Sequence, residues 1–209
     1  MDSSCPLCSS PSKLFFEKTY TCSHCLLVFK SSKLFLSPSE EAKRYQQHNN
    51  VSGDQGYIDF LNKLATPLKK FLKNEDHFLD YGCGPFSQIS KIVEADVGSI
   101  QFYDPLFFPE GITTDEKFDV VTCTEVAEHF RDPEREWDKL VARVKPNGIL
   151  GIMTQFYSAD INYKDWWYKN DPTHIVFYCQ ETLEYLAQKY HMKILYNDLR
   201  SVIIFQNGT

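Results

Sequence analysis

Apolar and polar positions change their period several times along the chain, and each change predicts a different element. Between residues 57 and 72 apolar side chains recur at steps of three and four, which predicts an amphipathic helix that Pro67 kinks or divides. Ser37 predicts the start of an earlier helix, because a hydroxyl that precedes two glutamates can cap a first turn. The polar residues 49–56 predict a loop between the two helices.

After residue 76, short apolar runs alternate with helical patterns. The predicted strands are 77–81, 99–103, 118–124, 149–155, 192–196 and 202–205, and the predicted helices are 88–94, 134–144 and 181–190. This alternation predicts an α/β fold whose sheet is mostly parallel and covered on both faces, with a C-terminal antiparallel hairpin. The aromatic stretch 156–178 has no clean period, and we expect it to be an insertion over the carboxyl ends of the strands.

Two close cysteine pairs distinguish the N-terminal segment. Cys5 and Cys8 form one C-x-x-C pair, and Cys22 and Cys25 form the second after thirteen residues. Four thiolates at this spacing can converge on zinc, and a metal is the usual way in which so short a segment stays folded. Four cysteine ligands leave no open position, so the predicted zinc is structural. A redox dithiol and a set of unligated cysteines are the alternatives.

These patterns predict an organisation in three parts. Residues 1–36 are the zinc-ribbon-like knuckle, residues 37–75 are a helical entry segment, and residues 76–209 are the main α/β domain with its aromatic insertion. No stretch approaches the roughly 20 apolar residues that span a bilayer. The N-terminus lacks a secretory signal, and the odd number of cysteines favours a reducing compartment, so we expect a cytoplasmic protein without a membrane partner.

Charge bears on the class of partner. The chain has 22 basic and 28 acidic side chains, for a formal net charge of −6, which does not favour broad capture of nucleic acid. A cluster of lysines between Lys63 and Lys73 leaves a local contact with RNA as an alternative, although such a cluster is more often the solvated face of a helix.

A glycine loop with a following acid carries the first candidate chemistry. Gly82 and Gly84 follow Asp80 at the end of a predicted strand, where glycines let the backbone approach a ligand closely. Asp104 ends the next strand, 24 residues after Asp80, where a carboxylate can accept hydrogen bonds from a ribose diol. A nicotinamide dehydrogenase is the competing interpretation, but its fingerprint needs a third glycine that this loop lacks.

Four segments resemble, in the right order, successive motifs of class I S-adenosylmethionine-dependent methyltransferases. They are Leu79 to Gly84, Tyr103-Asp104, Phe118 to Val121 and Lys145 to Gly148, within a resemblance that covers residues 78–205. The resemblance implies a Rossmann-like fold and S-adenosylmethionine as the cofactor. The cofactor-binding residues that it implies are Asp80, Gly82, Cys83, Gly84, Asp104, Thr124 and Glu125. Phe86 stands where the family usually has another glycine.

A further resemblance concerns the entry helix. Arg44 to His48 is similar to the entry helix of a bacterial subgroup of these methyltransferases that carries N-terminal C-x-x-C pairs. In this chain it implies that Tyr45 and His48 close over the cofactor.

The motif Glu125-Val-Ala-Glu128-His129 carries the second candidate chemistry. If it turns helically, Glu125 shares a face with Glu128 and His129, and His174 is a candidate fourth ligand for a second divalent metal. The motif resembles the Glu-x-x-Glu-His of small-RNA 3′-terminal 2′-O-methyltransferases and of ubiquinone-pathway O-methyltransferases, in which a metal holds the acceptor hydroxyls. The alternatives are contact with the cofactor alone, or general-base catalysis by His129 or His174.

The aromatic side chains of the insertion and the single cysteines have structural interpretations as well as functional ones. The aromatic side chains Trp166, Trp167, Tyr168 and Tyr178 either wall the acceptor pocket or form the core of the insertion. The three single cysteines, Cys83, Cys123 and Cys179, are interpreted as small apolar residues.

The leading functional hypothesis is O-methylation of a small hydroxylated acceptor, with or without the help of a metal. RNA methylation, in which the ribbon grips RNA, and a catalytically inactive binding module are the alternatives. The sequence leaves the acceptor and the oligomeric state open.

Overall fold

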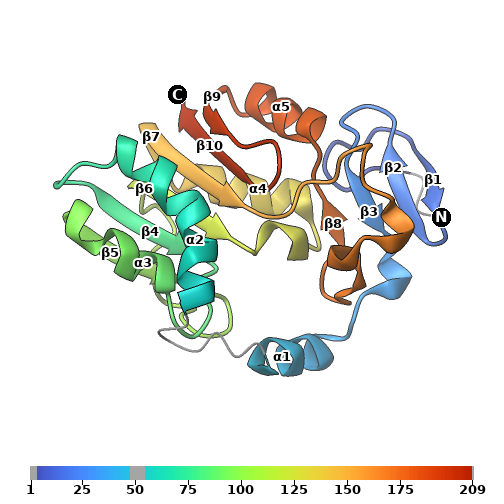
Figure 1. The fold of residues 1–209 in the computed structure, drawn as a ribbon, viewed down its shortest axis with the longest axis horizontal. Helices are drawn as coiled ribbons and strands as arrows, with labels where there is room; N and C mark the ends of the chain where they lie inside the picture. Colours follow the sequence, from blue (N-terminus) through green and yellow to red (C-terminus); the bar gives the residue numbers. More distant parts are fainter. Residues whose placement is uncertain (1–3, 48–54, 209) are drawn as a thin grey trace.

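The computed structural model describes residues 4–47 and 55–208. A six-stranded sheet and a four-stranded sheet organise these residues, and Figure 1 shows the smaller sheet at one end of the molecule. The larger sheet has the order β5-β4-β6-β7-β10-β9 and contains β4 (His77–Tyr81), β5 (Ser99–Tyr103), β6 (Phe118–Thr124), β7 (Val144–Met153), β9 (Met192–Asn197) and β10 (Val202–Asn207). Its first four strands are parallel, and β10 runs antiparallel to β7 and β9. This confirms the predicted α/β class and the C-terminal hairpin.

β7 begins five residues before the predicted strand. Val144 already pairs with Phe118, and the next pairing joins Ile149 to Val120, so residues 145–148 bulge out of the ladder. A side chain at Gly148 would place its Cβ 2.9 Å from the carbonyl oxygen of Asp119. Residues 145–148 are therefore a bulge inside a longer strand, and the close approach of the Asp119 carbonyl favours glycine at position 148.

Helices cover both faces of the larger sheet. They are α2 (Gln55–Leu68), α3 (Gln88–Val93), α4 (Pro133–Ala142) and α5 (Gln180–Lys189), whereas α1 (Pro38–Gln47) lies apart from the sheet (Figure 1). The short 3-10 turns are η1 (Ser32–Leu34), η2 (Lys69–Phe71), η3 (Glu94–Asp96), η4 (Ala127–His129), η5 (Tyr163–Asp165) and η6 (Trp167–Asn170). α2 packs Leu64 against the cluster that holds Val120 and Ile204. α4 and α5 bury Trp137 and Leu183 on the opposite face. The sheet is thus covered on both sides, as predicted.

The two N-terminal helices start and end for identifiable reasons. The Ser37 amide donates to the Glu40 carboxylate at 2.9 Å, and the Glu40 amide returns a bond to the Ser37 hydroxyl, so α1 begins with the predicted cap. α2 ends one residue after Pro67 and continues as the 3-10 turn η2. The predicted loop 49–56 lies mostly outside the described residues.

The smaller sheet joins the ribbon to the insertion. Its order is β1 (Ser12–Phe16), β2 (Thr19–Cys22), β3 (Val28–Lys30) and β8 (Val176–Phe177), and all of its pairings are antiparallel. β8 lies almost 150 residues after β3 along the chain and comes from the aromatic stretch. Leu27 and Phe29 of the ribbon also belong to the same apolar core as Trp137 and Leu183. The ribbon is therefore packed into the α/β part, which the sequence pattern did not predict.

Among the described helices, none combines the length and the apolar character that crossing a bilayer requires.

One buried hydroxyl fastens the turn η4 to the rest of the fold. The Tyr178 hydroxyl accepts a hydrogen bond from the Trp137 indole at 3.0 Å and donates to the Ala127 carbonyl at 3.0 Å. Tyr178 and Trp137 are both fully buried. The hydroxyl thus links α4, the insertion and η4 where water cannot replace it.

We predict that Tyr178→Phe lowers the free energy of unfolding by about 1–3 kcal/mol, because the substitution leaves a buried indole N–H without its acceptor. Urea denaturation measures the change. Tyr196→Phe on β9 is the matched control, since Tyr196 is half-buried, and it should change stability by less than about 0.5 kcal/mol. Equal stability of the two variants would contradict the assigned role of the Tyr178 hydroxyl.

Candidate functional site

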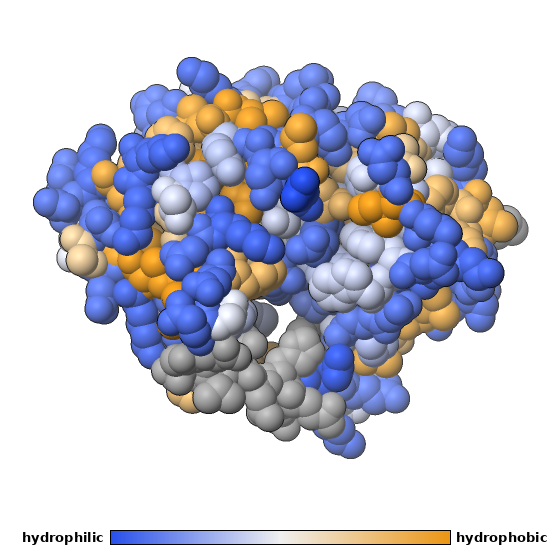
Figure 2. Space-filling model, in the orientation of Figure 1, coloured by the Kyte–Doolittle hydropathy of each residue, from blue (hydrophilic) through white to orange (hydrophobic). Residues whose placement is uncertain are grey.

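A large cavity opens beyond the carboxyl ends of β4 and β6, at the point where the strand order reverses. After β4 the chain moves outward to β5, and it then returns to the other side of β4 as β6, so the loops that follow β4 and β6 diverge. The cavity at this point has a volume of about 1010 Å³. Figure 2 shows the surface hollowed between the side built on the larger sheet and the side built on the ribbon and the insertion.

The glycine loop supplies one wall of the cavity. Gly82 and Gly84 both have positive φ angles, 78° and 62°, which side chains other than glycine rarely adopt. A Cβ at Gly82 would lie 2.4 Å from a methyl group of Val126, so this glycine allows the loops after β4 and β6 to touch. A Cβ at Gly84 would meet nothing within 4 Å, because this part of the loop faces open space.

The two acids predicted to bind cofactor also shape this loop. The Asp80 carboxylate is buried and accepts hydrogen bonds from the hydroxyls of Ser87 and Thr122. Burial raises the pKa of Asp80 to about 6, although these two bonds oppose the rise. Asp104 accepts the Gly84 amide at 3.0 Å and ties the glycine loop to the loop after β5. Both acids line the cavity.

Three buried polar atoms on the cavity wall suit a bound cofactor. The amide nitrogen of Gln88, the hydroxyl of Thr124 and the Oε1 atom of Glu125 have no hydrogen-bond partner among the described residues. All three residues line the cavity. Since buried polar groups are normally satisfied, these atoms and the open face of Gly84 fit a ligand that carries polar groups of its own.

The predicted contribution of the entry helix concerns two residues. α1 borders the cavity through Glu41 and Arg44. The side chain of Tyr45 and the whole of His48 lie outside the described residues, so their role at the cofactor stays a prediction.

Three predicted metal ligands converge beside the glycine loop. Ligand atoms of Glu128, His129 and His174 all lie within 4.8 Å of one another. The Glu128 side chain is 0% exposed, and its Oε2 atom has no partner among the described residues. An ionised carboxylate that is buried in this way needs a cation or a proton nearby.

Both imidazoles are oriented by backbone carbonyls. His129 Nδ1 lies 2.9 Å from the Thr173 carbonyl, and His174 Nδ1 lies 2.8 Å from the Tyr168 carbonyl. Because a carbonyl can only accept, Nδ1 carries the proton in each neutral ring, and Nε2 carries the lone pair. This arrangement is typical of histidines that bind a metal through Nε2.

Glu125 takes a different place from the one expected. It adopts a positive φ of 54° before η4, so it does not continue the face of Glu128 and His129, and it lies outside the group of three convergent ligands. The Tyr168 hydroxyl donates to Glu128 at 2.6 Å and lies 3.3 Å from Glu125. Burial and the nearby charge of Glu128 raise the pKa of Glu125 well above its usual value.

Among the aromatic side chains, Tyr168 fills both predicted roles, since it lines the cavity and also belongs to the buried apolar cluster of the insertion. Trp167, which is 66% exposed, and Tyr168 line the cavity. Trp166 and Tyr178 are buried in apolar clusters instead. Of the single cysteines, Cys123 and Cys179 are buried and Cys83 is partly buried in the glycine loop.

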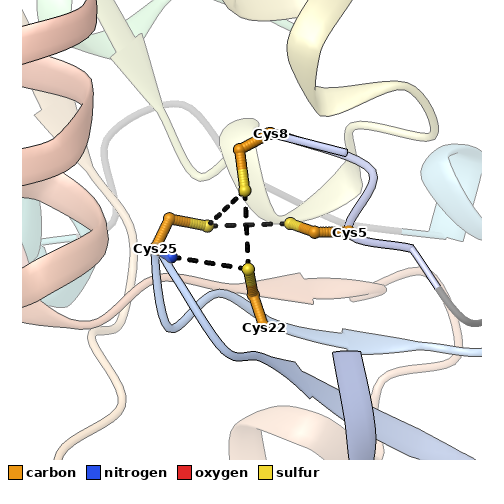
Figure 3. A group of neighbouring side chains, drawn as sticks. All are labelled: Cys5, Cys8, Cys22 and Cys25. Carbon is orange, nitrogen blue, oxygen red and sulfur yellow. Dashed lines mark hydrogen bonds between the residues drawn. The ribbon is translucent and has the colours of Figure 1, made fainter. Parts of the chain in front are cut away.

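The four N-terminal cysteines point their sulfur atoms at one centre (Figure 3). The Sγ atoms of Cys5 and Cys25 lie 3.6 Å apart, and those of Cys8 and Cys22 lie 3.4 Å apart. Tetrahedral zinc with sulfur ligands at about 2.3 Å places sulfurs about 3.8 Å apart, whereas a disulfide needs about 2.05 Å. The spacing is therefore compatible with zinc and excludes disulfides at these distances.

Sequence patterns did not reveal every residue of the site. The hydrogen bonds that Tyr168 makes near two carboxylates could not be foreseen, because the insertion has no period that orients its side chains. Gln88 was also missed, since one glutamine at the start of a helix carries no signal. Lys30 was missed as well, since a lone lysine after Val28 and Phe29 gives no sign of its contact with the Lys169 and Asp171 carbonyls.

Comparison with known proteins identifies the family. The sequence model for a methyltransferase domain matches residues 45–196. No curated protein sequence matches this chain.

Solved structures give the same fold at low identity. A putative methyltransferase from Haloferax volcanii, in complex with the Trm112 methyltransferase activator, is 11% identical with a TM-score of 0.60, over 79% of this chain and 98% of that one. The N-methyltransferase NodS from Bradyrhizobium japonicum, bound to S-adenosylhomocysteine, is 12% identical with a TM-score of 0.56, over 81% and 98%. The 1,6-didemethyltoxoflavin-N1-methyltransferase from Burkholderia thailandensis, also with S-adenosylhomocysteine, is 12% identical with a TM-score of 0.54, over 95% and 99%.

The family match covers well over half of the chain, and it agrees with the sheet order and with a glycine loop at the reversal point. The chain belongs to this methyltransferase family and is an S-adenosylmethionine-dependent methyltransferase of class I.

Proposed function

We propose that this enzyme methylates an oxygen atom of a small hydroxylated acceptor, such as a diol or a catechol, with the help of a divalent metal ion. The convergence of Glu128, His129 and His174 at the cavity carries the proposal. Two neutral imidazoles and a carboxylate form a ligand set that suits Mn²⁺, Fe²⁺ or Zn²⁺ better than Mg²⁺.

The cofactor end of the cavity is the glycine loop. We infer that the loop around Gly82 and Gly84 and the carboxylate of Asp104 hold S-adenosylmethionine, with Thr124 and Glu125 beside its reactive end. When bound, S-adenosylmethionine supplies the methyl group: the acceptor oxygen would attack the methyl carbon, the carbon–sulfur bond would break to release S-adenosylhomocysteine, and a base would take the hydroxyl proton. A carboxylate at Glu125 favours a positively charged ligand, since the cation offsets the repulsion between Glu125 and Glu128.

The acceptor end is the cluster of three ligands. A divalent ion held there would lower the pKa of an acceptor hydroxyl and fix the oxygen in place. Trp167 and Tyr168 would flank the acceptor, which excludes water from the reaction. Burial lowers the pKa of His174, so its Nε2 is unprotonated at neutral pH and is able either to bind a metal or to accept a proton.

We also propose that Cys5, Cys8, Cys22 and Cys25 bind one structural zinc ion. The support is the convergence of the four sulfur atoms and the backbone amides aimed at them. The amide of Leu7 approaches Cys5 at 3.4 Å, and the amide of His24 approaches Cys22 at 3.3 Å. Such amides stabilise thiolate charge.

RNA methylation remains the alternative acceptor class. The lysine cluster does not strengthen it, because Lys69 forms an ion pair with Asp96 at 2.9 Å and Lys63 lies over the Phe60 ring. The enzyme family argues against the third hypothesis, an inactive binding module.

Calorimetric titration with S-adenosylmethionine and S-adenosylhomocysteine tests the cofactor site first. We expect saturable binding of both, and Asp104→Asn should weaken it roughly 10-fold to 100-fold, as expected for losing hydrogen bonds to a charged group. Asp115→Asn, at an exposed position, is the matched control and should leave the affinity unchanged. If the folded protein binds neither ligand, the assignment of the cavity is wrong.

Titration with Mn²⁺ and Mg²⁺ tests the second metal in zinc-loaded protein. We expect Mn²⁺ to bind more tightly than Mg²⁺ and to accelerate methylation of a catechol. Glu128→Gln should weaken Mn²⁺ binding by roughly 10-fold or more, whereas His191→Gln, at an exposed histidine, should not.

The affinity for Mn²⁺ should change with pH in one direction only. Mn²⁺ affinity should fall as the pH drops, because protons compete for Nε2 of the imidazoles. Because the pKa of His174 is lowered, protons compete with the metal for its ring only below about pH 6.5, the ordinary pKa of histidine. Catechol methylation without any dependence on metal would instead favour His129 or His174 as a general base.

The zinc proposal has its own test. Elemental analysis should find about one zinc ion per chain, and Cys22→Ser should abolish it and lower the thermal stability, because the ribbon relies on the metal to stay folded. Cys83→Ser, outside the cluster, should retain the zinc. A zinc-free wild-type protein that is fully stable would refute the structural role.

A further inference from the structure

One turn of the insertion orients both imidazoles of the site. This site turn comprises residues 168–174. Its Tyr168 carbonyl accepts the hydrogen bond of His174 Nδ1 at 2.8 Å, and its Thr173 carbonyl accepts that of His129 Nδ1 at 2.9 Å. The direction of each Nε2 lone pair therefore depends on where the carbonyl oxygens of the site turn lie.

A lysine of the ribbon also holds this turn. Lys30 Nζ donates to the Lys169 carbonyl at 2.8 Å and to the Asp171 carbonyl at 3.0 Å. The Asp171 carbonyl also accepts the His174 amide at 3.2 Å. Lys30 itself is anchored by its backbone, since its amide donates to the Ile175 carbonyl at 2.8 Å in the pairing of β3 with β8.

Lys30 differs from a solvated surface lysine. Its Nζ lies 5.8 Å from the centre of the Phe177 ring, and Val28 and Phe29, which precede it on β3, are buried. Burial, together with the nearby charge of Lys169, lowers the pKa of Lys30 to about 8, although Asp171 opposes the shift. Withdrawing an ammonium group from water costs free energy, which the two carbonyl contacts offset.

Asp171 connects the site turn to a third element. Its carboxylate accepts hydrogen bonds from the Thr173 amide and hydroxyl at 2.9 and 2.6 Å, and from Arg44 of α1 at 2.8 Å. Although burial raises it, these bonds bring the pKa of Asp171 well below its usual value. The site turn is thus tied on three sides: to β3, to α1 and to the imidazoles.

We propose that Lys30 is a positioning residue, whose ammonium group fixes the site turn and thereby the orientation and the Nδ1–H tautomer of His174. The ribbon then acts on the site from a distance, because the strand that carries Lys30 directly follows the cysteine cluster along the chain. The consequence for metal binding and methylation rests on the proposed function, whereas the consequence for the His174 tautomer does not.

Histidine NMR on the full, zinc-loaded chain tests the proposal. Two-bond ¹H–¹⁵N spectra distinguish Nδ1–H from Nε2–H rings. The chain has 6 histidines, and the signals of His174 and His129 are identified by their loss in His174→Gln and His129→Gln. We expect the wild type to show Nδ1–H at His174. Lys30→Met should shift His174 toward the Nε2–H tautomer, because the Tyr168 carbonyl is no longer held in place. Lys13→Met, at an exposed lysine of β1, is the matched control and should leave the His174 spectrum unchanged.

Affinities separate positioning from general damage to the fold. In Lys30→Met, Mn²⁺ binding should weaken by about 10-fold to 100-fold, the usual effect of losing a residue that orients a metal ligand. Binding of S-adenosylhomocysteine and the zinc content should be retained, since Lys30 is not among the described residues that line the cavity. Lys30→Arg, which keeps a donor that can reach both carbonyls, should restore the His174 tautomer at least in part.

The outcomes divide clearly. A wild-type His174 spectrum in Lys30→Met would overturn the proposal. If Lys30→Met also loses S-adenosylhomocysteine binding, Lys30→Arg decides: recovery of binding together with the tautomer supports positioning, and recovery of binding alone overturns it. If the tautomer shifts in Lys30→Met but the wild-type protein binds no Mn²⁺, Lys30 still positions His174, and the metal-assisted function is what fails.

Discussion

The backbone of Ile175 joins the two sheets of this protein. Its amide donates to the Glu128 carbonyl at 2.9 Å, and its carbonyl accepts the Lys30 amide at 2.8 Å. One peptide segment therefore connects the turn after β6 to the ribbon, and the cavity lies at this junction. Since Ile175 and Glu128 are both buried, losing the bond between them would leave buried polar groups unsatisfied. The position of Glu128 and the packing of the ribbon therefore depend on each other.

Buried negative charge dominates the chemistry of the cavity. Glu125 and Glu128 share one hydroxyl, that of Tyr168, and each has a carboxylate oxygen without a partner among the described residues. Burial and the charge of Glu128 raise the pKa of Glu125, so a nearby cation would favour the ionised form of the Glu125 carboxyl. A positively charged cofactor at Glu125 and a metal ion at Glu128 would each supply such a cation, so the electrostatics of the cavity agree with both proposals.

The insertion supplies cavity residues that the common fold does not determine. The larger sheet and its glycine loop serve many acceptors in this fold class, so the fold itself does not select one. His174 and Tyr168 come from the segment between β7 and α5, and the ribbon holds that segment through β8. A two-residue strand would be too short to stand alone, but the Lys30 contacts and the shared apolar core secure it.

The sequence by itself determined the elements whose signals are local. The strands 77–81, 99–103 and 118–124 were predicted to the residue, because each is a short run rich in β-prone residues between turn signals. The tight glycine loop and the convergence of the four cysteines were also predicted, because the spacing of these residues along the chain indicates a turn and a possible set of zinc ligands. Only the tertiary structure decided that Glu125 leaves the ligand group, that β8 joins the ribbon and that Lys30 reaches the site turn. The β8 pairing and the Lys30 contacts join residues that are distant along the chain, and the place of Glu125 depends on one backbone angle after a strand. The periodicity of apolar positions contains no information about such contacts or about a single backbone angle.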